Sequence, residues 1–395
     1  MTKKTEKSIE KSFEELNISR TKGGVPSNSR IIKHYLCSLI VYGIGIFILL
    51  TNNWYSGILT GYVGNMPIKE FFKLLYLVYL VTALPIYLIF KPKSINSSNN
   101  IIIIEYFSRI AKKIFNRTEG SFIPDYRERQ AILLFMVKLF FGPQMVQYSL
   151  EGIRNMSAQS GQISYAITAA ISAHSLSPII FPDRQYADTL YYFMINLLFF
   201  IDTAFFAFGY LTETSFFGNK IRQVEDSLSG IVICLICYPP FSTATTSILG
   251  WYQNNSALYN NDISSPITIV FRILALVALT IYTCASIALF TKASNLTNRG
   301  TVSIFPYNII RHPAYLSKNL FWLLTAAPYF ITSAINFSVG YSSSLTAIIL
   351  AVLSLLSWAF IYFLRALAEE RMLMRDPDYQ EYAQRVKYRF IPGIW

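Results

Sequence analysis

Long apolar segments, separated by shorter polar ones, run through most of the chain. Crossing a bilayer takes about 20 residues of helix, and eight apolar segments approach or exceed that length, at residues 35–52, 71–90, 131–150, 187–211, 228–250, 266–290, 316–337 and 343–364. They lack the alternation that is typical of a membrane β-barrel. The pattern therefore predicts an all-α, polytopic membrane bundle with about eight transmembrane helices.

Composition and charge agree with a membrane protein and indicate its orientation. Of the 395 residues, 53% are hydrophobic and only 14% are charged, whereas soluble domains carry about a quarter charged residues. The net charge is +12, but Lys and Arg gather in every second connection, and the other loops hold only Lys69, Arg154 and Arg184. The positive-inside rule then places both termini in the cytoplasm. This distribution explains the basic charge without nucleic-acid binding. We expect a multi-pass protein of a bacterial cell membrane, with membrane lipids as partners and no nucleic acid.

Polar and proline residues inside the apolar segments are a second feature. Lys138 and Asp202 lie within the third and fourth segments, and because isolated charges are costly in lipid, they are predicted to pair. Whether such a pair is structural or functional stays open. Pro239 and Pro240 in the fifth segment should break its helix, as happens at the binding sites of many transporters.

Cysteine and histidine give little sign of metal chemistry. Cys234 and Cys237 form a CxxC spacing, which can bind metal or undergo redox reactions, but the surrounding "GIVICLICYPP" is apolar and has no second ligand pair. We interpret both as buried helix residues. The three histidines lie far apart in the sequence, with His174 alone in a segment of undecided structure, so no metal site is expected.

The stretch "YNIIRHPAYLSKNLFWLL" places polar groups directly before an apolar helix. Pro313 suits the first turn of a helix, because the N–H that proline lacks has no partner there anyway. The free N–H groups of such a turn favour an anion, and Arg311, His312 and Tyr315 would add side-chain donors.

A second polar cluster, "RALAEERMLMRDPDYQEYAQRVKYRFIPGIW", follows the last apolar segment. Arg365 and Glu369 are four residues apart and share a helix face. Asp376 and Pro377 predict a new short helix. A hairpin of the last two segments would bring both clusters together. On these residues alone, a pocket with an anion site and a basic cap on the membrane surface are equally open.

The two clusters in this order, from "SNLTNRGTVSIFPYNIIRHPAYLSKN" to the C-terminal stretch, resemble the isoprenylcysteine carboxyl methyltransferase family over residues 270–395. This family belongs to a wider group of integral membrane methyltransferases that includes phospholipid N-methyltransferases. The resemblance implies S-adenosylmethionine as cofactor, in a cytoplasm-facing pocket lined by Arg299, Gly300, Thr301, Val302, Tyr307, His312, Pro313, Ala314, Tyr315 and Glu369. It also implies that Arg365 contacts the acceptor. The chain departs from the family at Arg299, where a histidine is more common, and at "DPDY", where "FGxxY" is usual in a longer connection.

The expected function is transfer of a methyl group to a lipid-soluble acceptor, with Arg365 and His312 as candidate catalytic residues. Arg365 would orient an acceptor carboxylate, which needs no base, whereas an amine acceptor would need His312 or Glu370 as base. Two alternatives stay open, a membrane transporter and a nicotinamide-dependent reductase of the steroid-reductase type. The only GxG, Gly43 and Gly45, lies within the first segment and is interpreted as a packing feature, since no strand precedes it.

The resemblance also suggests a division of the chain into three parts. Residues 1–33 are expected to be a polar cytoplasmic tail, and residues 34–265 an additional transmembrane region of unknown role. Residues 266–395 would form the methyltransferase-like membrane core with its cytoplasmic C-terminal cap.

Overall fold

The computed structural model describes residues 24–116, 121–172, 184–213, 217–249, 266–338 and 343–394. The chain divides into two compact units. Unit 1 comprises Met1–Gln147, Ala207–Asp226 and Ser294–Gly300, and unit 2 comprises Tyr148–Phe206, Ser227–Ala293 and Thr301–Trp395.

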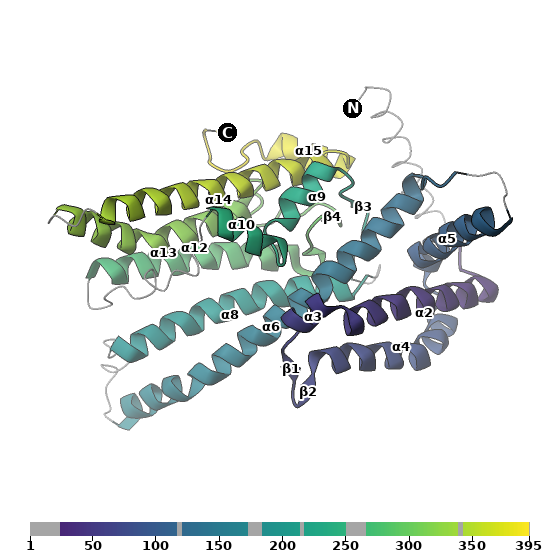
Figure 1. The fold of residues 1–395 in the computed structure, drawn as a ribbon, viewed down its shortest axis with the longest axis horizontal. Coiled ribbons are helices and arrows are strands. Elements are labelled where there is room, and N and C mark those ends of the chain that lie inside the picture. Colours follow the sequence, from purple (N-terminus) through teal and green to yellow (C-terminus); the bar gives the residue numbers. More distant parts are fainter. Residues whose placement is uncertain are drawn as a thin grey trace. The chain divides into compact units, whose positions relative to one another are not determined.

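Helices account for nearly all of the regular structure (Figure 1), and the elements are α2 Asn28–Thr51, α3 Asn53–Ile58, β1 Tyr62–Val63, β2 Met66–Pro67, α4 Ile68–Phe90, η1 Lys93–Ser97, α5 Asn99–Asn116, α6 Tyr126–Ser172, α8 Arg184–Leu211, β3 Gln223–Val224, α9 Leu228–Leu235, α10 Phe241–Leu249, α12 Pro266–Leu289, η2 Phe290–Lys292, β4 Thr297–Asn298, α13 Pro313–Ser338, α14 Ser343–Leu373 and α15 Pro377–Arg385. Within the described residues, six helices are long and apolar enough to cross a membrane, namely α2, α4, α6, α8, α12 and α14. The chain is therefore a helical membrane protein, and the number eight and the side of the termini stay predictions.

The predicted break in the fifth apolar segment is confirmed. Two short helices, α9 and α10, replace one long helix, and a turn that contains Pro239 and Pro240 separates them. Neither proline can donate a backbone hydrogen bond, so a continuous helix would lose two of its bonds here.

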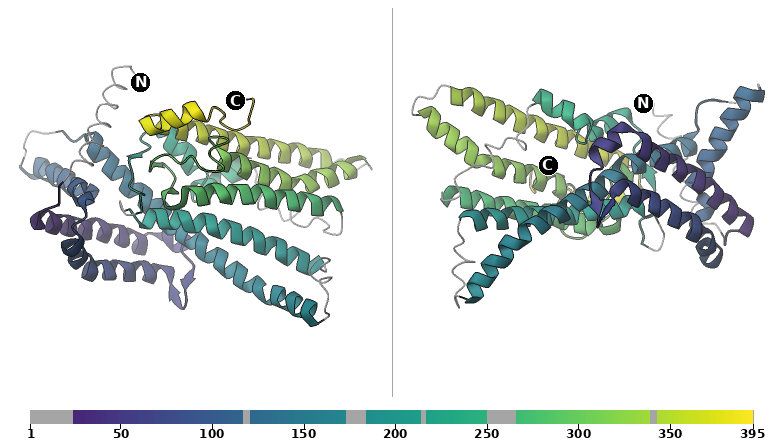
Figure 2. Two further views of the ribbon diagram at one scale, coloured as in Figure 1. Left: turned by 180° about the vertical axis from the view of Figure 1, so that it is seen from behind. Right: turned by 60° about the horizontal axis from the view of Figure 1, so that its bottom comes forward.

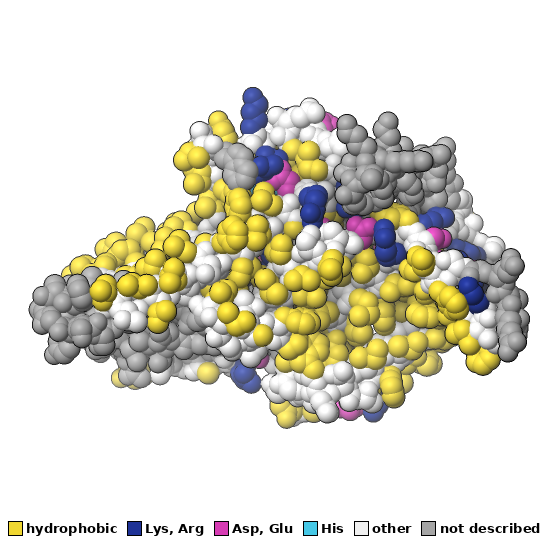
Figure 3. Space-filling model, turned by 45° about the horizontal axis from the view of Figure 1, so that its top comes forward, with side chains coloured by type: hydrophobic (Ala, Val, Ile, Leu, Met, Phe, Trp, Pro, Cys, Tyr) yellow, Lys and Arg dark blue, Asp and Glu magenta, His cyan; other side chains and the backbone are white. Residues whose placement is uncertain are grey.

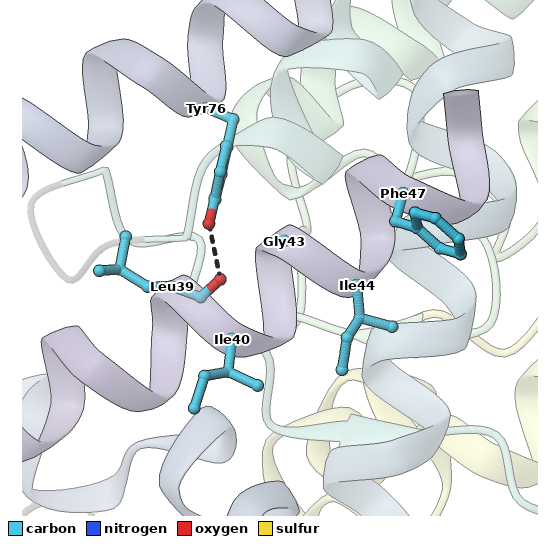
Figure 4. A pocket seen from close by; sticks show the side chains of 6 residues that line it. All are labelled: Leu39, Ile40, Gly43, Ile44, Phe47 and Tyr76. Atoms are coloured by element: carbon cyan, nitrogen blue, oxygen red, sulfur yellow. Dashed lines mark hydrogen bonds between the residues drawn. The ribbon is translucent and has the colours of Figure 1, made fainter. Parts of the chain in front are cut away.

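In unit 1, α2 packs against α4 and α5. Gly43 allows α4 to approach closely, because a Cβ there would lie 2.9 Å from the Tyr76 hydroxyl oxygen. That hydroxyl donates to the Leu39 carbonyl at 3.0 Å, beside an open groove lined by apolar side chains of α2 (Figure 4). Gly43 thus has the packing role that the sequence predicted.

The predicted pair of Lys138 and Asp202 is wrong. Lys138 Nζ lies 2.6 Å from Glu213 Oε2 in unit 1. In unit 2, Asp202 instead accepts hydrogen bonds from the hydroxyls of Tyr282 and Ser286. Glu213 follows the fourth apolar segment by only two residues, and the flexible Lys138 side chain reaches it.

In unit 2, α12, α13 and α14 lie side by side (Figure 2). Small residues on α12, among them Ala275 and Ala278, let α13 approach closely, and Phe321 and Trp358 fill the space between the helices. Helix α8 joins this core through Leu198, whose carbonyl accepts from the Thr283 hydroxyl at 3.3 Å. The core of unit 2 thus fixes the relative positions of α8, α12, α13 and α14.

Outward-facing side chains of both units are largely apolar. Figure 3 shows hydrophobic side chains over much of one face, and large exposed ones include Val277 on α12, Leu356 and Phe360 on α14, and Phe47 on α2. Such extensive apolar exposure is unusual for a soluble protein, and it fits helices whose backbone polar groups are satisfied internally within lipid.

Candidate active site

The hairpin of α13 and α14 brings the two polar clusters of the sequence together. The Tyr315 hydroxyl, in the first turn of α13, donates to the Glu369 carboxylate near the end of α14. His312 Nε2 lies 3.2 Å from Glu370 Oε2. The predicted proximity of the clusters is confirmed.

Glu370 is the centre of a buried charge network. Only 4% exposed, it contacts Arg311, His312 and Arg389, the last at 2.8 Å from Nε to Oε2. A buried carboxylate needs such partners, because an isolated charge is costly to remove from water. His312 and Glu370 therefore hold each other and the two arginines in place.

The start of α13 is tied to the segment that follows α15. Helix α13 begins at Pro313, as the sequence predicted. The N–H groups of Arg311 and His312 donate to the carbonyls of Tyr388 and Arg389, each at 2.9 Å. These two N–H groups are therefore occupied. The predicted anion site at the first turn of α13 would have to use the N–H groups of Ala314 and Tyr315.

Arg365 lies among aromatic rings inside unit 2. Its guanidinium carbon is 5.3 Å from the ring centroid of Tyr238 and 5.6 Å from that of Tyr315. Its Nη2 donates to the Tyr238 hydroxyl at 3.3 Å, and the residue is 9% exposed. Tyr238 was missed by the sequence analysis. The signal that could have found it is its position directly before Pro239 and Pro240, where the broken helix directs a side chain into the unit.

Helix α15 covers the loop before α13. Asp376 caps this helix by accepting from the Asp378 N–H at 3.1 Å, and the Tyr382 hydroxyl donates to the Tyr307 carbonyl at 2.7 Å. Tyr379 and Tyr382 are buried, so α15 turns this aromatic face inward. Burial raises the pKa of Tyr307 and of Tyr379, so both phenols keep their protons at neutral pH.

Two buried hydroxyl groups near this loop are candidates for ligand contacts. Thr301 Oγ1 and the Tyr379 hydroxyl have no hydrogen-bond partner among the described residues. A buried polar group without a partner costs about 1–3 kcal/mol. Both hydroxyls can therefore bond to a ligand, and the Glu369 carboxylate can accept a hydrogen bond from one.

The predicted cofactor residues are divided between the two units. Thr301, Val302, Tyr307, His312, Pro313, Ala314, Tyr315 and Glu369 belong to unit 2, but Arg299 and Gly300 belong to unit 1. Arg299 donates there to the Asn219 carbonyl and to Ser294 Oγ, both at 2.8 Å. Gly300 has φ +95, and a Cβ on it would lie 3.1 Å from the Arg222 side chain. Arg299 thus has a packing role in unit 1, and its predicted contact with a cofactor stays a prediction.

Metal ligands and cysteine chemistry do not emerge in the part of the chain that is described. No group of three His, Cys, Asp or Glu side chains suitable for a metal occurs within it. Cys234 is buried, and the Cys237 thiol donates to the Ile233 carbonyl at 3.5 Å, one turn earlier. His174 lies outside the described residues.

No family model, curated protein or solved structure matches the chain. The assignment of a function therefore depends on the residues described above.

Proposed function

We propose that this chain is an integral membrane methyltransferase of the isoprenylcysteine carboxyl methyltransferase type, which uses S-adenosylmethionine to methylate a lipid-soluble carboxylate. The supporting observation is the contact between Tyr315 of the "RHPAY" turn and Glu369, with Arg365 one helical turn earlier on α14. These are the residues that carry the resemblance to the family, and they come from separate parts of the sequence.

The cofactor would be held on the side of Glu369. The carboxylate of Glu369 can accept from the ammonium or hydroxyl groups of S-adenosylmethionine, and Thr301 Oγ1 and the Tyr379 hydroxyl can bond its remaining polar groups. When bound, the cofactor supplies a methyl group on a sulfonium, which is electrophilic without further activation.

The acceptor would be held by Arg365. A guanidinium can bind both oxygens of a carboxylate, which fixes the plane and direction of the nucleophile. Since an ionised carboxylate needs no general base, the protein contributes chiefly by alignment and exclusion of water. His312 and Glu370 then act as positioning residues, because their network holds the start of α13 against the end of α14. We place this site on the cytoplasmic side, from the distribution of Lys and Arg.

Transport is the second candidate function. It is favoured by the interruption between α9 and α10, because interrupted helices line substrate sites in many transporters. In this structure the same interruption presents Tyr238 to Arg365, so the site proposed for the acceptor also lies beside the interrupted helix.

The test is calorimetric titration of the detergent-purified protein with S-adenosylhomocysteine, with NADPH as the negative control. Removing one hydrogen-bond partner of a charged group costs about 1.5–3 kcal/mol, so Glu369→Gln should weaken binding by about 10- to 100-fold. Glu381→Gln on exposed α15 surface is the matched control and should bind as the wild type does, since its side chain is 74% exposed. Arg365→Met should spare cofactor binding and abolish turnover.

Failure to bind S-adenosylhomocysteine, in protein that unfolds cooperatively on heating, would reject the methyltransferase. The transporter would then become the leading candidate. Loss of cofactor binding in Arg365→Met would show that the roles of Arg365 and Glu369 have been confused.

A further inference from the structure

A layer of polar side chains crosses the interior of unit 2. Asp202 on α8 is 7% exposed, and it accepts from the Tyr282 hydroxyl at 2.8 Å and from the Ser286 hydroxyl, both on α12. Lys318 on α13 places its ammonium 5.4 Å from the Tyr282 ring centroid and 5.6 Å from that of Tyr362 on α14. Four helices thus contribute to one layer.

The contacts within this layer put its residues at about one level of unit 2. With a rise of about 1.5 Å per residue, Lys318 is about 8 Å from the first residue of α13, and Tyr282 and Asp202 are about 10 and 14 Å from the last residues of α12 and α8. In a bilayer whose hydrocarbon core is about 30 Å thick, we expect these groups to lie within that core. Charged side chains at such depth are expensive, and most mark a functional site.

Lys318 and Arg365 border the same pair of rings. Tyr315 and Lys318 are three residues apart on α13, and Tyr362 and Arg365 are three apart on α14, so each pair shares a helix face. The ring centroids of Tyr315 and Tyr362 are 6.3 Å apart, with Arg365 against the first ring and Lys318 against the second. In the described part of the chain, Lys318 forms no salt bridge, and Asp202 is satisfied by two hydroxyls.

We propose that Lys318, together with Arg365, binds the anionic head of the acceptor, and that Asp202 of α8 adjusts the charge of this site to suit a monovalent carboxylate. This proposal rests on the proposed function, in which Arg365 faces the acceptor and Glu369 the cofactor. Apart from Glu369, which is assigned to the cofactor, two cations and one buried carboxylate leave one positive charge at the acceptor. A single carboxylate on a long apolar chain neutralises it, whereas a phosphate dianion would leave a negative charge in a low-dielectric interior.

The proposal gives the region before residue 266 a role in the reaction. The resemblance to the methyltransferase family covers only residues 270–395, but Asp202 and Leu198 of α8 pack directly on α12 of that core. Helix α8 would therefore form one wall of the acceptor site rather than a separate module.

Binding of radiolabelled palmitate to the full chain in a neutral detergent tests the proposal, with methyl palmitate as the uncharged probe. Wild-type protein should bind palmitate and prefer it to the ester. Lys318→Met should weaken palmitate binding by at least about tenfold, since one charge-assisted hydrogen bond contributes about 1.5–3 kcal/mol, while Lys318→Arg retains it. Binding of S-adenosylhomocysteine should stay at the wild-type level in both variants. Lys387→Met, an exposed lysine in the cap, is the matched control.

A structural role of Lys318 as the counter-charge of Asp202 predicts a different result. The double variant Asp202→Asn with Lys318→Met would then regain both stability and wild-type palmitate binding, which overturns the proposal. Unchanged palmitate binding in Lys318→Met, with S-adenosylhomocysteine still bound, overturns it too but leaves the methyltransferase intact. Palmitate binding that depends on Lys318, in protein that binds no S-adenosylhomocysteine, would support the anion site and reject the methyltransferase.

Discussion

Glu213 shows how a single residue outside an apolar segment can determine the partner of a charge inside one. Burial alone would raise the pKa of Glu213, but the ammonium of Lys138 and its hydrogen bond hold that pKa below its usual value. The pair is partly accessible, with side-chain exposures of 27% and 19%. Because the pKa of Glu213 is lowered in the folded protein, the contribution of this pair to the free energy of unfolding should depend on pH.

The first residue-scale prediction concerns this pair. Glu213→Gln should lower the free energy of unfolding by about 1–3 kcal/mol at pH 7, because it leaves the Lys138 ammonium without its carboxylate. Because the folded-state pKa of Glu213 is depressed, its contribution is present above the unfolded-state pKa of about 4.3 and is lost as pH falls through the folded value. Thermal unfolding in detergent, compared between the variant and the wild type from pH 7 to pH 3, should show the difference shrinking.

A double-mutant cycle with Lys138→Met provides the control for this prediction. The combined variant should be less destabilised than the sum of the single changes. Strict additivity would mean that the two residues do not interact in solution.

Which residues could be predicted depended on whether local sequence determined their positions. Pro313 and Asp376 were identified correctly, because helix starts have strong local signals. The contact of Tyr315 with Glu369 followed from the hairpin. Tyr238 and Lys318 were not identified as site residues, because their positions depend on packing between four helices rather than on neighbours in the sequence.

At the scale of elements, α15 acts as a cap whose stability should affect the site. Asp376→Ala removes the N-cap, which costs about 0.5–2 kcal/mol. The backbone amides of residues 378–385 should then exchange about 2- to 30-fold faster in hydrogen-exchange measurements, and binding of S-adenosylhomocysteine should weaken. Glu381→Ala on the exposed face of the same helix is the control. Exchange that stays as slow as in the wild type would show that tertiary contacts alone hold α15.

Helix α6 was the element least well predicted. An apolar segment at 131–150 was predicted, but the helix runs over Tyr126–Ser172. The residues after 150 are too polar to match the pattern of a membrane segment, yet they contain no proline that would end the helix. Packing of α6 on α8 supports this extension, where Gly152 lets the Phe200 side chain approach closely.

At the scale of the whole molecule, the compact units do not follow the three parts expected from the sequence. Unit 2 combines the methyltransferase-like segment with residues of α6 and α8, and unit 1 includes residues 294–300. The sequence shows which segments are apolar and where helices begin or end, whereas these units are defined by contacts between segments that lie far apart in the sequence. The functional division of the chain stays a prediction.

Topology is the prediction that belongs to this scale. In a cysteine-free background, Tyr62→Cys lies before α4, and Lys93→Cys and Lys387→Cys lie after α4 and α15. If both termini are cytoplasmic, a membrane-impermeant maleimide should label the first variant in intact cells and the other two only after permeabilisation. Labelling of Lys387→Cys in intact cells would place the proposed site on the opposite side.

The backbone contacts of Tyr388 and Arg389 have a consequence for biosynthesis. During translation, α13 and α14 leave the ribosome before these two residues emerge from it. The carbonyls that hold the start of α13, and the Arg389 side chain that contacts Glu370, arrive only afterwards. A chain interrupted after α14 would thus insert its helices but lack the contacts that complete the proposed site, and it should lack the proposed activity although it is neither misinserted nor unfolded.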